Sequence, residues 1–350
     1  MNITEIPVEG YEMVKMAEDP AVGFRAIIAV HDTSLGRALG GCRMWPYASM
    51  EEGLKDVLRL ARGMTYKSAV ARTGLGGGKS VLFGDSATER TAERFRAMGE
   101  FVESFGGKYI TAEDVGTSVA DMEWIREKTQ WVTGRSREDG GSGDPSPYTA
   151  LGTFLGIRAY VEETLKKDDL QGVRVAIQGV GHVGIYLGQK LRDAGCVLTI
   201  CDINREKVEA AAKELGASVC DPDEVYSRDV DVYAPCALGA VVNDKTIPEF
   251  KCRIIAGAAN NVLAEPRHGD ELRQRRIRYA PDYVINAGGV INVACEFLPG
   301  GYDEAVSLKK IDGIYDTLKA ILRISDEKDI STAVAANHLA EEILAEAKSS

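Results

Sequence analysis

Two lysines in the first quarter of the chain stand in unusual sequence contexts. Lys67 ends a helical pattern, and Lys79 directly follows three consecutive glycines. Much later the chain carries a glycine-rich fingerprint, Gly179-Val180-Gly181-His182-Val183-Gly184, which is typical of dinucleotide binding. Two cations can hold a carboxylate and move a proton. Together with a dinucleotide site, they predict redox chemistry on a small anionic substrate.

The fingerprint lies in the context that dinucleotide binding requires. An apolar, strand-like run at 173–177 precedes it, a helical pattern follows, and Asp202 ends the next expected strand. We expect Gly179 to make the tight turn, Gly181 to let a pyrophosphate approach the backbone, and Gly184 to pack helix against strand. Asp202 should bind the adenosine ribose and repel a 2′-phosphate, which favours NAD over NADP. The alternative is an ordinary strand–turn–helix.

The glycines before Lys79 do not match a phosphate-binding loop. That motif needs a glycine at position 73, where Thr73 stands, and the run follows a helix and enters a strand. We expect instead a glycine-rich turn at which backbone and substrate approach closely, with Lys79 partly desolvated beside it. Desolvation and the neighbouring cation Lys67 would favour the neutral amine, which can act as a general base. For either lysine alone, a solvated surface charge is the ordinary alternative.

Composition excludes several classes of protein. The chain has 350 residues, enough for two domains with separate cores, and its net charge of −11 disfavours a nucleic-acid partner. We find no secretory signal and no apolar run long enough for a membrane span. Seven cysteines without a Cys-x-x-Cys pair predict reduced thiols in a cytoplasmic protein, and four scattered histidines predict no metal site.

The pattern of elements predicts an α/β protein with two domains. A polar stretch at 134–147, rich in glycine, serine and proline, is the expected linker or hinge. After it, strand-like runs at 173–178, 197–202, 230–234, 253–256 and 277–280 alternate with helical patterns, which indicates βαβ units and a parallel sheet. We expect a first domain over 1–134, with strands at 24–30, 80–83 and 108–111, and a Rossmann-type domain over 148–329.

Seven segments together resemble the glutamate/leucine/phenylalanine/valine dehydrogenases, and most closely the leucine enzymes, followed by the phenylalanine enzymes. The resemblance runs from about residue 25 to the C-terminus, and the order in which the segments match makes it specific. The segments are Leu39-Gly40-Gly41-Cys42-Arg43-Met44, Gly63-Met64-Thr65-Tyr66-Lys67, Gly76-Gly77-Gly78-Lys79, Thr111-Ala112-Glu113-Asp114-Val115-Gly116, Ala234-Pro235-Cys236-Ala237-Leu238-Gly239, Gly257-Ala258-Ala259-Asn260-Asn261 and Ala280-Pro281-Asp282-Tyr283-Val284-Ile285-Asn286-Ala287-Gly288-Gly289.

The resemblance implies reversible, NAD-dependent oxidative deamination of an L-amino acid to a 2-oxo acid and ammonia. Lys67 would bind the substrate carboxylate, helped by Asn261 and by backbone near Gly40. Lys79 would activate the attacking water, and Asp114 would shuttle a proton. For an isolated Asp114 the alternative is a loop acid bonded to local backbone, and for Asn261 it is a turn former.

The resemblance also implies how the chain is organised around NAD. The fingerprint residues Gly179, Gly181, Val183 and Gly184 would hold the cofactor together with Asp202, Asn261 and Thr149, the last near the nicotinamide amide. A cleft between the domains would hold the substrate. The final helix, at about 330–350, would return to the first domain, through which family members form homo-oligomers.

The substrate side chain is the least specified part of the interpretation. The family's pocket positions fall on Leu39, Gly40, Met64, Ala112, Glu113, Val290 and Val293. Ala112, Glu113 and Val290 resemble leucine dehydrogenases, whereas Gly78 and Cys42 resemble certain phenylalanine dehydrogenases. We therefore predict a branched-chain aliphatic substrate, with phenylalanine as the alternative. Glutamate is disfavoured because the pocket offers no second cation. Cys295 departs from the aspartate usual in leucine enzymes.

Two alternatives come from other functional classes. One is a catalytically silent NAD-binding regulatory protein, which would be expected to have lost a catalytic position, whereas Lys67, Lys79, Asp114 and Asn261 are all in place. The other is a hydroxy-acid dehydrogenase, which lacks support because the usual His–Arg pair near the cofactor is missing.

Overall fold

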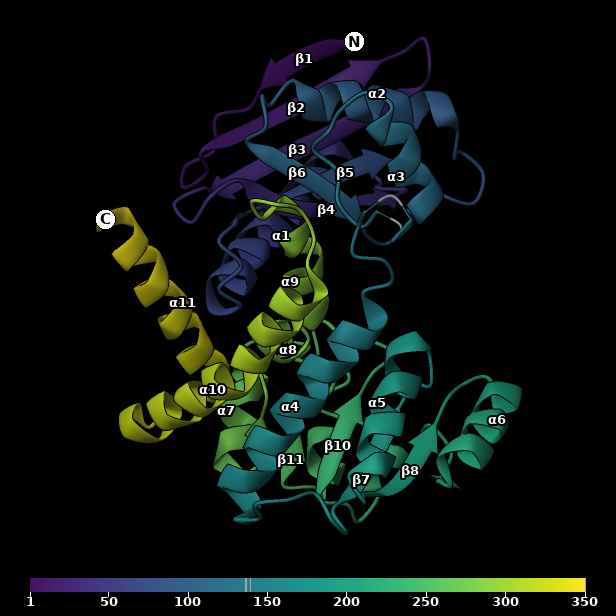
Figure 1. Cartoon of the computed structure of the whole chain (residues 1–350), viewed down its shortest axis with the longest axis vertical. Coiled ribbons are helices and arrows are strands. Elements are labelled where there is room, and N and C mark those ends of the chain that lie inside the picture. Colours follow the sequence, from purple (N-terminus) through teal and green to yellow (C-terminus); the bar gives the residue numbers. More distant parts are fainter. Residues whose placement is uncertain (136, 139, 350) are drawn as a thin grey trace. The chain divides into compact units, whose positions relative to one another are not determined.

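The fold is described on a computed structural model of residues 1–135, 137–138 and 140–349 (Figure 1). The chain divides into two compact units. The first comprises Met1–Asp144, Val293–Glu304 and Ala340–Ser350, and the second comprises Pro145–Asn292 and Ala305–Leu339. Compared with the expected ranges 1–134 and 148–329, the first unit also contains most of the polar stretch and a short segment after residue 292.

The first unit is built on a six-stranded sheet in the order β1-β2-β3-β5-β4-β6. β4 runs parallel to both β5 and β6, whereas β1, β2, β3 and β5 pair antiparallel in succession. The strands are β1 Asn2–Glu5, β2 Met13–Asp19, β3 Phe24–Asp32, β4 Ala38–Trp45, β5 Gly76–Phe83 and β6 Tyr109–Glu113, and the helices are α1 Met50–Val70, α2 Ala92–Glu103 and α3 Val119–Arg126.

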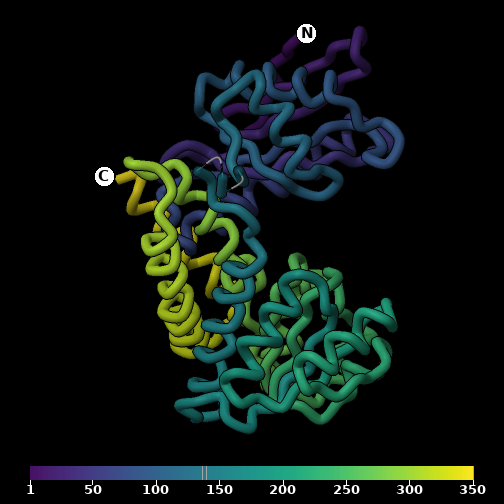
Figure 2. The backbone as a smooth tube through the Cα atoms, turned by 45° about the vertical axis from the view of Figure 1, so that its right-hand side comes forward, coloured from purple at the N-terminus to yellow at the C-terminus, as the bar shows by residue number. Residues whose placement is uncertain are grey.

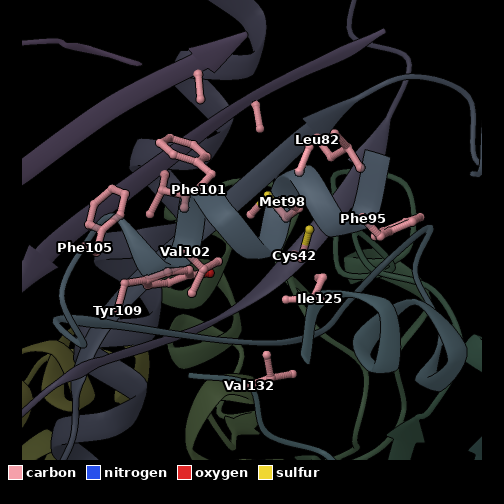
Figure 3. Packing of buried hydrophobic residues seen from close by; sticks show 14 of the residues in the cluster. Cys42, Leu82, Phe95, Met98, Phe101, Val102, Phe105, Tyr109, Ile125 and Val132 are labelled. Atoms are coloured by element: carbon pink, nitrogen blue, oxygen red, sulfur yellow. The ribbon is translucent and has the colours of Figure 1, made fainter. Parts of the chain in front are cut away.

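Two apolar cores cover the two faces of this sheet. On one face, Val57 and Ala61 of α1 pack against Val81 of β5. On the other face, α2 contributes a larger cluster that includes Phe95, Met98 and Phe101, together with Cys42 of β4 and Tyr109 of β6 (Figure 3). The parallel strands β4 and β5 and the helix α1 between them form a βαβ unit. In this unit α1 covers one face of the sheet, and α2 covers the opposite face.

Local chemistry explains where α1 begins. Ser49 is the N-cap, and its side chain accepts a hydrogen bond from the Glu52 backbone N–H at 3.1 Å. The Glu52 carboxylate accepts from the Ala48 backbone N–H at 2.8 Å. The first bond satisfies a donor that the first helical turn leaves open, and the second fixes the chain just before the helix.

The glycine run before Lys79 lies inside strand β5 and does not form a turn, so that expectation was wrong. A Cβ on Gly77 would lie 2.0 Å from the Thr65 backbone nitrogen of α1, and one on Gly78 would lie 2.9 Å from the Tyr109 ring. The glycines are therefore required by close packing of α1 and β6 against β5.

The polar stretch expected to be a linker is attached to the first unit through Glu296. The Glu296 carboxylate is fully buried and accepts hydrogen bonds from the backbone N–H groups of Gly134, at 3.2 Å, and Ser142, at 2.8 Å. It also pairs with Arg135 at 3.2 Å. Positions 136 and 139 of this stretch lie outside the described residues.

The second unit is built on a six-stranded, fully parallel sheet in the order β12-β11-β10-β7-β8-β9. The order reverses between β7 and β10, as in the dinucleotide-binding Rossmann fold, so the predicted fold class is confirmed. The strands are β7 Arg174–Gln178, β8 Val197–Cys201, β9 Ser218–Val219, β10 Val232–Pro235, β11 Ile254–Ile255 and β12 Arg278–Tyr279.

Helices pack around this sheet, and α10 lies beside α4 (Figure 2). Glycines on α4 allow the close approach, because a Cβ on Gly156 would lie 2.7 Å from the Leu318 side chain of α10. The remaining elements are α4 Ser146–Leu165, α5 His182–Asp193, α6 Arg205–Leu215, α7 Arg267–Gln274, α8 Asp282–Ile285, α9 Gly288–Ala294, α10 Glu304–Lys328 and α11 Thr332–Ser349, with short 3-10 turns at Val225–Ser227, Ile247–Glu249 and Cys295–Phe297.

The end of α11 belongs to the first unit, where Lys348 pairs with Asp32 at 2.7 Å and Glu341 accepts a hydrogen bond from the Tyr66 hydroxyl at 2.8 Å. Across the described ranges, no helix combines the length and the apolar character that crossing a membrane requires.

Candidate active site

Lys79 and Asp114 form a buried ion pair in the first unit. Lys79 lies on β5, and its side chain is 6% exposed. Asp114 directly follows β6, and its Oδ2 lies 2.9 Å from the Lys79 Nζ. Strand β4 separates β5 from β6 in the sheet, so two residues 35 positions apart (114 − 79) meet across it. The structure thus brings together the two residues predicted to be catalytic.

Gly41 of β4 provides the space in which this pair meets. A Cβ at Gly41 would lie 2.7 Å from the Asp114 Cβ, 2.9 Å from the Glu113 carbonyl oxygen and 3.3 Å from the Lys79 Nζ. The first two distances are too short for any side chain. The glycine therefore leaves Lys79 and Asp114 unobstructed across the middle strand.

Arg43 is a third member of the site that sequence reasoning missed. Its Nε lies 3.1 Å from Asp114 Oδ2, the oxygen that Lys79 also contacts, and its NH1 lies 3.0 Å from Asp56 of α1. Asp56 in turn binds the Tyr47 hydroxyl at 2.7 Å. Arg43 stands in a segment that carries the family resemblance, but its partner is 71 residues away, so spacing alone gave no signal.

These contacts keep Asp114 ionised. Burial by itself raises the pKa of its carboxyl group, but the charges and hydrogen bonds of Lys79 and Arg43 outweigh burial and hold the pKa below its usual range. Both cations contact Oδ2. In the described ranges no hydrogen-bond partner is recorded for Oδ1, which is therefore placed to accept a proton.

We expect Asp114→Asn to lower the free energy of unfolding by ~3 kcal/mol at pH 7, because Lys79 would lose its partner while buried. Since the folded-state pKa of Asp114 is below the unfolded value of ~3.9, its stabilisation is complete above that value and disappears as the pH falls through the folded-state pKa. Urea unfolding of both proteins between pH 7 and pH 3 should show the difference shrinking. An unchanged difference at pH 3 would contradict this account, and exposed Asp223→Asn is the control.

The other predicted substrate residues of the first unit are placed as follows. Lys67 lies in the last turn of α1 and is partly buried, in a position where a cation also complements the helix carbonyl end. The Gly40 carbonyl accepts a hydrogen bond from the Tyr109 hydroxyl at 2.6 Å. Leu39 is buried, Met64, Ala112 and Val293 are partly buried, and Glu113 is exposed.

Three further predicted residues belong to the second unit. Thr149 lies in the first turn of α4, and its hydroxyl donates to the Pro145 carbonyl at 3.1 Å. Val290 lies on α9. Asn261 is exposed on the loop after β11, where its backbone adopts a left-handed φ of 53°. That conformation agrees with the turn-forming alternative.

The three fingerprint glycines have the geometry that dinucleotide binding requires. Gly179 adopts a φ of 99°, in the region that favours glycine. A Cβ on Gly184 would lie 2.1 Å from the Gly179 carbonyl oxygen, so only glycine fits there. A Cβ on Gly181 would meet nothing within 4 Å, so the loop faces open space at the N-terminus of α5. Exposed backbone at a helix N-terminus suits a pyrophosphate.

Asp202 holds the fingerprint loop from the end of β8. Its Oδ2 accepts a hydrogen bond from the Val180 backbone N–H, and its Oδ1 accepts one from the Asn204 backbone N–H, both at 2.9 Å. The carboxylate is partly exposed beside the loop. These residues fit an adenine dinucleotide, with the pyrophosphate at Gly181 and the ribose at Asp202.

Comparison with known proteins agrees with this fold and site. The family "Glu/Leu/Phe/Val dehydrogenase, dimerisation domain" matches residues 8–131, and the family "Glutamate/Leucine/Phenylalanine/Valine dehydrogenase" matches residues 140–205 and 196–350. A leucine dehydrogenase of Bacillus cereus is 51% identical over 97% of this chain and 92% of its own length. A phenylalanine dehydrogenase of Bacillus thermotolerans is 43% identical over 95% and 88%.

A crystal structure of L-tryptophan dehydrogenase from Nostoc punctiforme superposes with a TM-score of 0.88 at 43% identity, over 97% of this chain and 98% of that one. The Rossmann unit with its fingerprint loop and the named relatives define the class of this protein as nicotinamide-dependent dehydrogenases. The chain belongs to the Glu/Leu/Phe/Val dehydrogenase family. It is an oxidoreductase that carries out reversible oxidative deamination of L-amino acids.

Proposed function

We propose that this enzyme deaminates branched-chain, leucine-like L-amino acids with NAD, giving the 2-oxo acid and ammonia, and that Lys79 and Asp114 are its catalytic pair. The observation that carries this proposal is the buried contact of 2.9 Å between Lys79 Nζ and Asp114 Oδ2 beside the space left by Gly41. A buried lysine that passes its proton to an adjacent carboxylate becomes a neutral amine, which can then take a proton from water.

Each residue of the first unit has a distinct proposed role. Lys67 remains protonated and binds the substrate carboxylate, with the backbone near Gly40 helping to orient it. Lys79 first gives its proton to the adjacent Asp114, and the resulting neutral amine acts as general base toward the water that attacks the iminium carbon. Asp114 receives a proton at Oδ1 and returns it to the departing ammonia. Arg43, which contacts Asp114 but no reacting atom, is a positioning residue.

The second unit is proposed to hold NAD. When bound, the nicotinamide ring supplies the acceptor for the hydride that leaves the substrate Cα. Gly179, Gly181, Val183 and Gly184 bind the pyrophosphate, and Asp202 binds the ribose hydroxyls. The Asp202 carboxylate would repel a 2′-phosphate, which supports NAD over NADP. Thr149 and Asn261 are proposed to contact the nicotinamide side.

The side chains on the same face of the sheet as Lys79 support the proposed aliphatic specificity. Ala112 of β6 is in register with Gly41 of β4, whose Cβ position lies next to the Lys79 Nζ. Gly78 and Cys42, which resembled phenylalanine enzymes, contact Tyr109 and the α2 core instead (Figure 3). They therefore carry less weight for the substrate pocket, to which Leu39, Met64, Val290 and Val293 are proposed to contribute.

A substrate and cofactor panel tests this proposal. The purified enzyme would receive L-leucine, L-valine, L-isoleucine, L-phenylalanine, L-tryptophan or L-glutamate with NAD or NADP, and reduced cofactor would be followed by absorbance. We expect an aliphatic amino acid to lead phenylalanine by at least ~10-fold in kcat/KM, the scale of a misfit of one or two methylene groups. A lead for phenylalanine or for NADP would contradict the substrate or cofactor assignment.

Gly181→Ala tests the proposed pyrophosphate contact. The position of the added Cβ is open, so the variant should fold with an unchanged melting temperature. The methyl group would hold a pyrophosphate away from the backbone, so we expect the KM for NAD to rise ~10-fold or more, equivalent to ~1.4 kcal/mol. Gly313→Ala, in the same unit and with an equally open Cβ position, is the control for a glycine change, and an unchanged KM in Gly181→Ala would refute the contact.

We further propose that the enzyme is a cytoplasmic homo-oligomer. Buried thiols such as Cys42, Cys201 and Cys252 support a reducing compartment. The match of residues 8–131 to a dimerisation domain supports assembly through the first unit.

A further inference from the structure

A cavity of about 370 Å³ opens in the second unit, at a place that the deamination reaction does not use. Arg253 directly precedes β11, and Arg278 is the first residue of β12, so the cavity lies at the amino ends of these strands. The fingerprint loop follows the carboxyl end of β7. Because the sheet is parallel, the two sites lie at opposite edges.

Four arginines line this cavity: Arg253, Arg273, Arg276 and Arg278. The lining carboxylates are Glu163, Asp326 and Asp329, so the formal charge of the lining is +1 (4 − 3). Asp329 pairs with Arg273, Asp326 pairs with Arg278 at 2.6 Å, and Glu163 pairs with Lys319 at 3.1 Å. In the described part of the chain, no carboxylate partner is recorded for Arg253 or Arg276.

Buried polar atoms without partners gather at the same cavity. Among the described residues, eight buried side-chain nitrogen or oxygen atoms have no hydrogen-bond partner, and they include Thr164 Oγ1 and Arg273 Nε of the lining. A third, Ser331 Oγ, belongs to a residue that is 2% exposed and lies 3.5 Å from the Cβ position of Gly269, another lining residue. All three can donate hydrogen bonds, so a ligand with several acceptor oxygens would satisfy them.

The backbone of Arg276 gives an independent indication. Arg276 follows the C-terminus of α7 with a left-handed φ of 61°. Its N–H bonds to the Arg273 carbonyl, and the next N–H, of Ile277, bonds to the Leu272 carbonyl, both at 2.9 Å. Helix ends of this kind favour glycine. Arg276 adopts this conformation although it is unfavourable for a residue with a side chain, and it adds a fourth guanidinium group to the cavity.

We propose that this cavity is a binding site for a small phosphate-bearing anion that carries at least two phosphate groups. Planar guanidinium groups bind phosphate oxygens in pairs, and the unpartnered hydroxyl of Thr164 adds a donor on the lining. The cavity volume is in the range of small-ligand sites, and its polar lining does not suit an apolar ligand. The site is separate from the NAD site and does not depend on the proposed substrate.

The test uses isothermal titration of the purified, full-length enzyme with inorganic pyrophosphate. NAD is kept saturating so that the fingerprint loop is occupied, and ionic strength is held constant. We expect saturable binding in wild type and in Gly181→Ala. Arg276→Gly should weaken pyrophosphate binding at least tenfold and keep or raise the melting temperature, because glycine prefers its φ. Thr164→Val removes one donor without a change of shape and should weaken binding to a smaller extent.

Arg72→Gly is the matched control, because it also removes an arginine from a left-handed position after a helix, with a φ of 48°, but it belongs to the first unit and does not line the cavity. Its pyrophosphate affinity should equal that of wild type. Citrate is titrated in parallel. Absence of saturable pyrophosphate binding, equal affinity in Arg276→Gly, or citrate binding as tight as pyrophosphate would each overturn the proposal.

Discussion

Lys79→Met is expected to reduce kcat for oxidative deamination by about 10³-fold, within the range that general acid–base catalysis contributes. Methionine keeps a long unbranched side chain in the buried position on β5, but it can neither accept nor deliver a proton. Asp114 remains compensated because Arg43 still lies 3.1 Å from its Oδ2. The variant should therefore fold, and the loss should reflect chemistry.

The different proposed roles of Lys67 and Lys79 predict different effects on KM and kcat. Lys67 is proposed to hold the substrate carboxylate, so the KM for the amino acid should change much less than kcat in Lys79→Met. Stopped-flow measurement of the first turnover would isolate the chemical step. Lys55→Met, at an exposed position on α1, is the control and should retain wild-type kcat. A kcat within tenfold of wild type in Lys79→Met would remove Lys79 from the proposed mechanism.

Gly41→Ala should lower kcat by about 10²-fold, although Gly41 carries no functional group. Its Cβ would lie 2.7 Å from the Asp114 Cβ and 3.3 Å from the Lys79 Nζ, so these two side chains must move apart. A displacement of ~1 Å in a catalytic group can cost a factor of 10². Overpacking should also lower the free energy of unfolding by ~1–3 kcal/mol.

Thermal unfolding and steady-state kinetics on the same preparation would separate these two effects. Gly313→Ala is the matched control, since a Cβ at this position in α10 meets nothing within 4 Å. It should leave kcat unchanged and can raise stability by up to ~1 kcal/mol. If Gly41→Ala keeps wild-type kcat, the pair tolerates displacement and the proposed geometry is not required for catalysis.

Only part of the environment of Lys79 could be predicted from the sequence. Its burial could be predicted, because the flanking residues are glycine and apolar. Its ion-pair partner could not be predicted from the sequence. The recorded partner is Asp114, fixed in turn by Arg43. Asp114 meets Lys79, 35 positions away, and Arg43, 71 positions away, because β4 lies between β5 and β6. The spacing of these residues along the sequence does not predict that strand order.

The sequence by itself determined the parallel sheet of the second unit and the strand–glycine–helix fingerprint with Asp202. These follow from hydrophobic periodicity, caps and glycine placement, which act over a few residues. Tertiary structure alone decided that Gly76–Gly78 lie in a strand, that Gly41 makes room for a Lys–Asp pair, and that four arginines meet in one cavity. Such features depend on which strands and helices become neighbours, and that is decided by packing of the whole core.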